Sequence, residues 1–203
     1  MVGIITNMKL EIIRQYTSNY AIKLHVRELA KNIEKSHVTL LPHLEGLKED
    51  KVLLSEKKGR NRYYTLNLAN ITTRNYLIMA EGLRTIRYLN QVFLIKKLAK
   101  ILAELQLPGC FVLFGSYAKH TFDSKSDIDL LYIGTNTITE QKNILKQTNT
   151  LRKKINMKYL TPKQFNKALI TKDNLVKEIV KSHILIQNPG IFVNTLGNYY
   201  ETR

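Results

Sequence analysis

Apolar and polar positions along the first seventy residues predict three short helices. Apolar residues recur at helical spacing over residues 8–16, 26–33 and 35–47. Ser36 is expected to cap the third helix. Pro42 lies inside that segment and removes one helical hydrogen bond, so we expect the helix either to begin later than Ser36 or to be kinked. The apolar stripe expected on this helix consists of Val38, Leu41, Leu44 and Leu47.

Two strands are predicted to follow these helices. Residues 51–56 and 62–66 read as strands, and residues 57–61 join them as a hairpin with a glycine in its turn. The turn is basic, because its sequence is Lys-Lys-Gly-Arg-Asn. Residues 76–105 form a long apolar-rich stretch without proline, which predicts one helix, or two helices broken near Asn90-Gln91. Pro108-Gly109 then ends the helical region.

The candidate chemistry lies between Phe111 and Leu131. An apolar run meets Gly115-Ser116, and ten residues later Asp127 and Asp129 alternate with apolar residues. This alternation is that of a strand, so both carboxylates project from one side while Ile128 and Leu130 enter the core. Two neighbouring carboxylates favour a hard cation such as Mg²⁺, with a phosphate completing its shell.

Gly115 allows the backbone to come near a phosphate, and Ser116 is expected to cap a helix whose free N–H groups face that phosphate. The segment therefore predicts a site for a nucleoside triphosphate and Mg²⁺. Its pattern resembles the DNA-polymerase-beta-like nucleotidyltransferase superfamily, and in particular the minimal nucleotidyltransferases. The resemblance covers roughly residues 108–200. It implies that Asp127 and Asp129 are catalytic and bind metal, and that Gly115 and Ser116 hold the triphosphate; we add Lys119 to the nucleotide-binding set.

The chain departs from this family at the third carboxylate, which lies on a later strand. After a polar, helix-like stretch (residues 139–154), residues 153–161 read as that strand, with Ile155 and Met157 on one face. The other face carries Asn156 and Lys158 and no acid. We therefore expect nucleotide or metal binding to persist and turnover to be impaired. Lys158 is expected to reach Asp129.

The net charge of the chain gives an indication of its binding partners. The chain has 32 Lys and Arg against 16 Asp and Glu, a net charge of +16. Residues 1–70 carry 12 basic and 7 acidic residues, and residues 71–203 carry 20 and 9. This excess indicates a polyanionic partner such as nucleic acid, although charge alone equally fits a lysine-rich surface.

The sequence shows no pattern typical of a membrane span or a secretion signal. No apolar run approaches the roughly 20 residues of a membrane span. The N-terminus shows no secretion signal, and the one cysteine, Cys110, cannot form an internal disulfide. We therefore expect a cytoplasmic protein with no membrane partner.

The three helices and basic hairpin resemble a winged helix-turn-helix domain of prokaryotic transcription regulators. In such domains the third helix enters the major groove of double-stranded DNA and the wing touches the backbone. The resemblance implies that the DNA-contacting residues are Lys35, Ser36, His37, Thr39 and His43 near the third helix, and Lys57, Lys58, Arg60 and Arg62 in the wing.

Together these patterns predict an α+β protein. A winged helix-turn-helix domain (residues 1–70) is followed by a connecting helix or helices (71–107), where we expect a homodimer interface, and by a small α/β nucleotidyltransferase-like domain with a mixed sheet (108–203). Two classes of function compete. Either the second domain senses a nucleotide or docks a protein partner while the first binds DNA, in an antitoxin-like regulator, or the second domain transfers a nucleoside monophosphate to a protein or small-molecule hydroxyl. The missing third acid favours the first class.

Overall fold

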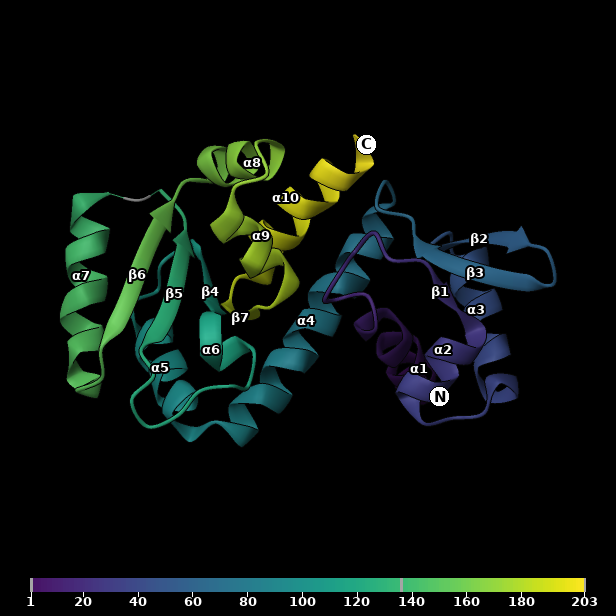
Figure 1. Cartoon of the computed structure of the whole chain (residues 1–203), viewed down its shortest axis with the longest axis horizontal. Helices are drawn as coiled ribbons and strands as arrows, with labels where there is room; N and C mark the ends of the chain where they lie inside the picture. The colour runs from purple at the N-terminus through teal and green to yellow at the C-terminus, as the bar shows by residue number, and fades with distance from the viewer. Residues whose placement is uncertain (1, 136, 203) are drawn as a thin grey trace. The chain divides into compact units, whose positions relative to one another are not determined.

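The computed structural model describes residues 2–135 and 137–202, with side chains from residue 8 on (Figure 1). The chain forms two compact units. One unit comprises the chain before Glu81 together with the residues from Leu196 on, and the other comprises Glu81–Thr195. Among the described residues, no helix combines the length and the apolar character needed to cross a bilayer.

The first unit contains three helices and a three-stranded antiparallel sheet. Its elements are α1 (Val2–Arg14), β1 (Leu24–His25), α2 (Val26–Ile33), α3 (His37–Glu49), β2 (Leu53–Lys58) and β3 (Asn61–Leu66). The strand order is β1-β3-β2, so β1 adds a strand that the sequence pattern did not predict. The buried Tyr16 hydroxyl donates to the carbonyl of Tyr64 at 3.1 Å and links the turn after α1 to β3.

Helix α3 begins directly after Ser36 and includes Pro42, so the first of our two alternatives, a start later than Ser36, is wrong. The expected apolar stripe is also wrong in part. Leu44 and Leu47 are buried, but Val38 is 62% exposed and Leu41 is 39% exposed, and Leu40 takes the inner position. A helix turns by about 100° per residue, so the nine steps from Val38 to Leu47 place the side chains of Val38 and Leu47 on opposite sides of α3.

The basic hairpin is tighter than the sequence suggested. Strand β2 continues to Lys58 and β3 begins at Asn61, which leaves Gly59 and Arg60 as a two-residue turn. Gly59 has φ +62°, a conformation that such turns require and that glycine adopts without steric cost.

The long apolar stretch forms two helices, α4 (Ile71–Gln91) and α5 (Phe93–Glu104). They separate at Val92, next to the break expected near Asn90-Gln91. The alternative of one uninterrupted helix is therefore excluded.

The second unit is built on a mixed sheet, as predicted. Its strands are β4 (Cys110–Phe114), β5 (Ile128–Ile133), β6 (Ile155–Leu160) and β7 (Ile184–Gln187), in the order β6-β5-β4-β7. Strands β5 and β6 are parallel, and the other pairs are antiparallel. The remaining helices are α6 (Gly115–Ala118), α7 (Ile138–Thr148), a 3₁₀ turn (Asn149–Leu151), α8 (Pro162–Ile170), α9 (Asn174–Lys181) and α10 (Pro189–Glu201), whose residues from Leu196 on belong to the first unit.

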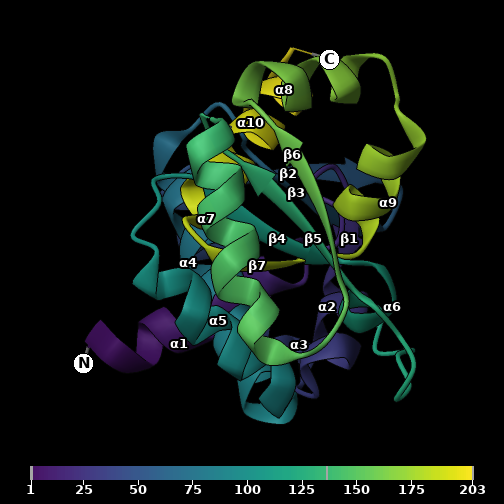
Figure 2. The same ribbon diagram turned by 90° about the vertical axis from the view of Figure 1, so that its left-hand side faces the viewer.

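Helices α5 and α7 pack together on one face of this sheet (Figure 2). Ile128 and Leu130 are fully buried in the core beneath them, as predicted. Because side chains alternate along a strand, Asp129 projects from the opposite face. Ile155, Met157 and Tyr159 also pack against the core under α5 and α7, so Asn156 lies on the same face as Asp129. The alternation of β5 and β6 thus positions the candidate site.

Candidate nucleotide and metal site

The two aspartates lie where β5 begins. Asp127 immediately precedes β5, and Asp129 pairs with Phe114 at the end of β4. This pairing brings Gly115, the next residue after β4, against the Asp129 side chain. A Cβ at position 115 would lie 2.1 Å from Asp129 Oδ2, and the backbone there has φ +69°. Both the close approach and the backbone conformation therefore require glycine at this position.

Ser116 does not cap the short helix α6, contrary to our expectation. The capping residue is Phe114, which makes no side-chain capping bond, and Ser116 is already the second residue of the helix. The left-handed turn at Gly115 starts the helix earlier than the sequence pattern suggested. Lys119 follows α6, and its ammonium forms an ion pair with Glu178 of α9 at 3.1 Å. Ser116 therefore lies within the helical turn that starts at Gly115, and Lys119 caps its C-terminal end.

Asn156 lies directly beside the aspartates. It is the register partner of Asp129 across the parallel β5–β6 pair. Its side-chain amide donates to Asp129 Oδ1 at 3.0 Å and, more weakly, lies 3.4 Å from Asp127 Oδ2. One amide thus faces both carboxylates, and the position carries no acid.

The lysine at the carboxylates is Lys154 and not Lys158. Lys158 pairs with Leu131, two residues further along the strands, and is exposed. The Lys154 ammonium lies 2.5 Å from Asp127 Oδ2. The predicted strand (residues 153–161) included Lys154, and residues 154, 156 and 158 share one face by alternation, but the pattern does not specify which lysine on that face reaches the carboxylates.

Lys154 also changes the acidity of the site. Its hydrogen bond to Asp127 holds the pKa of that carboxyl below its ordinary value of 3.8, and the same contact raises the pKa of Lys154. A carboxyl with a lowered pKa stabilises the fold above its unfolded pKa, and that contribution is lost as pH falls through the folded pKa. The contact lies at the surface, where solvent screens it.

We expect the Lys154→Gln variant to raise the pKa of Asp127, because the cation that stabilises the ionised carboxylate is removed. Carboxyl ¹³C chemical shifts followed from pH 2 to pH 7 measure this change. Lys153→Gln is the matched control and should raise the pKa of Asp127 less, since the Lys153 ammonium donates to the carbonyl of Ser124 at 2.8 Å and lowers that pKa only through its charge, as the smallest of the causes. An equal shift in both variants would contradict a specific Lys154–Asp127 contact.

The donor set fits one hard divalent cation. Asp127 and Asp129 converge on a single amide group, and Mg²⁺ in proteins is commonly held by one or two carboxylates together with substrate phosphates and waters. Within residues 2–135 and 137–202, no group of three or more His, Cys, Asp or Glu side chains is arranged to hold a metal ion. These residues therefore fit a metal that shares its shell with a phosphate better than a metal held by the protein alone.

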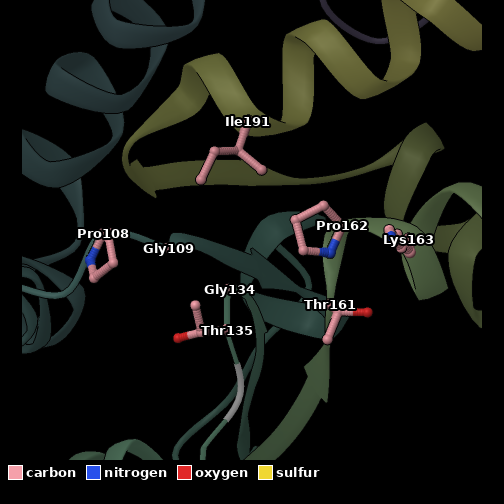
Figure 3. A pocket seen from close by; sticks show the side chains of 8 residues that line it. All are labelled: Pro108, Gly109, Gly134, Thr135, Thr161, Pro162, Lys163 and Ile191. Carbon is pink, nitrogen blue, oxygen red and sulfur yellow. The ribbon is translucent and has the colours of Figure 1, made fainter.

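A separate pocket of about 420 Å³ lies at the other ends of the same strands (Figure 3). Its lining includes Thr135, after β5, and Thr161, after β6, with Ile191 of α10 across from them. Because β5 and β6 are parallel, their far ends lie a full strand length from the aspartates. This pocket is therefore not part of the carboxylate site.

The residues expected to contact DNA lie at the surface of the first unit. Ser36 caps α3 and accepts a hydrogen bond from the Thr39 backbone N–H at 3.1 Å, as predicted. Lys35 and His37 are exposed, and His43 is half-buried. Lys57, Lys58 and Arg60 are exposed on the hairpin, whereas the Arg62 guanidinium forms an ion pair with Glu45 of α3 at 2.8 Å.

Comparison with known families agrees with this geometry. Residues 96–189 match the family described as Polymerase beta, Nucleotidyltransferase. That range includes β4 through β7 together with both aspartates, so this part of the chain is a nucleotidyltransferase-like domain. No curated protein matches the chain.

Proposed function

We propose that this protein is a DNA-binding transcriptional regulator whose nucleotidyltransferase-like domain binds a nucleoside triphosphate with Mg²⁺ but is impaired in transferring the nucleoside monophosphate from it and releasing pyrophosphate. The observation that carries the proposal is the surroundings of the two aspartates. A neutral amide faces both carboxylates, and a lysine ammonium lies 2.5 Å from one of them.

In this proposal Asp127 and Asp129 hold Mg²⁺, and Gly115, Ser116 and Lys119 bind the triphosphate. When bound, the metal neutralises phosphate charge. The close approach of Gly115 to Asp129 would bring backbone N–H groups near the same phosphates. The exposed Lys119 would exchange Glu178 for a phosphate, since a surface ion pair contributes little free energy.

Weak turnover follows from the lack of a third carboxylate beside Asp127 and Asp129. A group that helps to deprotonate an attacking hydroxyl must accept a proton, and an amide such as that of Asn156 does not. A second metal would need more negative charge than two carboxylates provide, and the Lys154 ammonium reduces that charge further. Binding without transfer is the expected consequence.

An active Mg²⁺-dependent transferase, acting on a protein or small-molecule hydroxyl, is the second candidate. One observation favours it: the Lys154 side chain is 71% exposed, so it can leave Asp127 when a metal arrives. In that case Asp127 and Asp129 would have to hold the metal for nucleotidyl transfer without a third carboxylate.

The DNA-binding role is supported by the first unit. Three helices and a three-stranded sheet with a basic hairpin are the elements of a winged helix-turn-helix domain, which we assign to residues 1–70. We propose that a homodimer interface forms within residues 71–107, on the α4 helix that carries the exposed Met79 and Ile86, and that the protein acts in the cytoplasm.

Replacing Lys57, Lys58 and Arg60 with alanine is expected to weaken binding to duplex DNA and to flatten its salt dependence by about 0.9 per lost phosphate contact. Adding Arg62→Ala should change the slope less, because Arg62 is already paired with Glu45. Fluorescence anisotropy across a salt series measures both effects. The control is the Lys167, Lys177 and Lys181 to alanine triple variant, which removes the same charge from the second unit. Equal losses in both triple variants would contradict a specific wing contact.

A further inference from the structure

A second pocket lies on the α5 and α7 face of the nucleotidyltransferase-like domain. It has a volume of about 380 Å³, within the range of small-ligand sites. The lining residues are Leu94, Lys97, Lys100, Ile101, Thr150 and Leu151. The aspartates project from the opposite face of the sheet, so this pocket is distinct from the candidate nucleotide site. Its walls combine apolar side chains with two ammonium groups.

An exposed aromatic ring adjoins this pocket. Phe93, the first residue of α5, is 69% exposed although it is a large apolar side chain. The Lys97 ammonium lies over its ring, 4.7 Å from the ring centroid. A ring of this kind offers a flat apolar surface to another aromatic group, with a cation next to it.

The positive charge at the pocket is not neutralised by nearby acids. Within the part of the chain that the structure describes, neither Lys97 nor Lys100 forms an ion pair. Helix α5 contains a single acid, Glu104, and Arg152, which follows the lining residue Leu151, is exposed. In a symmetric contact at this pocket, a second copy of the chain would bring its own Lys97 and Lys100 close to the same two ammonium groups, which disfavours it as the occupant here.

We propose that this pocket, with Phe93, binds single-stranded nucleic acid. An unpaired base stacks on Phe93 or enters the apolar pocket, and the neighbouring phosphates contact Lys97 and Lys100. Aromatic stacking next to cations is the usual chemistry of single-strand recognition, whereas a duplex hides its bases. The proposal does not depend on the wing or on turnover at the aspartates.

The test uses the full chain with labelled RNA and DNA strands of about 12 nucleotides, a length within known single-strand sites. In the Lys97→Gln/Lys100→Gln variant, the salt dependence of binding should fall by about 1.4, or about 0.7 for each lost phosphate contact. The control is Lys177→Gln/Lys181→Gln, which removes the same charge from α9. Equal losses in both variants, or no loss in either, would overturn the proposal. Whichever of the RNA and DNA strands binds more tightly identifies the preferred sugar.

The Phe93→Ala variant tests base stacking. Its affinity for the strands should fall about fivefold to 100-fold, with the salt dependence unchanged. Unchanged affinity would overturn the proposal, as would a change of molar mass in light scattering, which would make Phe93 part of an interface between copies. Duplex binding should respond to the hairpin variants and not to Phe93→Ala, so failure of the wing assignment and failure of this inference are distinguishable.

Discussion

The Asn156→Asp variant is expected to bind Mg²⁺ more than about tenfold more tightly than the wild type. The new carboxylate would stand where an amide now faces both Asp127 and Asp129. Three converging carboxylates attract a divalent cation more strongly than two, and even after solvent screening the added attraction should exceed the free energy of a tenfold change. Isothermal titration calorimetry with and without a nucleoside triphosphate measures the effect.

The matched control is Asn166→Asp, which adds the same charge at an exposed position of α8. Combining Asn156→Asp with Lys154→Gln should increase metal affinity further, because the competing ammonium at Asp127 is removed. If Asn156→Asp and Asn166→Asp gave the same metal affinity, position 156 would not belong to the metal site.

The Gly115→Ala variant is expected to lose triphosphate binding and to lower the free energy of unfolding by roughly 1–3 kcal/mol. The added Cβ would meet Asp129 Oδ2 at 2.1 Å, and alanine does not readily adopt φ +69°. Either the carboxylate or the start of α6 must move. Chemical denaturation and calorimetry with Mg²⁺ and each nucleoside triphosphate measure the two effects.

Gly82→Ala provides a matched control. Gly82 lies inside α4, and a Cβ there would have no neighbour within 4 Å. Removing a helical glycine should therefore raise the free energy of unfolding by about 0.5–1 kcal/mol without changing nucleotide binding. A Gly115→Ala variant as stable and as active in binding as the wild type would contradict the geometry of the site.

Sequence patterns predicted those features of the fold that depend on local periodicity. Strand alternation placed Ile128 and Leu130 in the core and identified β6. The lack of proline with a polar pair predicted either one long helix or two helices, and the structure has the two helices α4 and α5. The stripe on α3 was partly wrong, because steps of three residues drift around a helix. The strand β1 was not predicted, because its two residues are too few to show the alternation of a strand.

The candidate site was predictable as far as the motif extends. Gly115 and the aspartates come together as the spacing suggested, because β4 and β5 are antiparallel neighbours. Lys158 was expected to reach Asp129, but the register of the parallel β5–β6 pair, which no local pattern specifies, places Asn156 there. The Lys154 contact required the path of a long, flexible side chain from outside the strand.

The most direct test of the account is a nucleotidyl-transfer assay on the unmodified protein with labelled ATP and Mg²⁺, in which both labelled products and released pyrophosphate are measured. Because Asn156 cannot serve as the third carboxylate and Lys154 competes at Asp127, we predict that ATP binds while pyrophosphate release stays at the background rate. Robust Mg²⁺-dependent release that is abolished by Asp127→Ala would contradict the account and establish the protein as an active transferase.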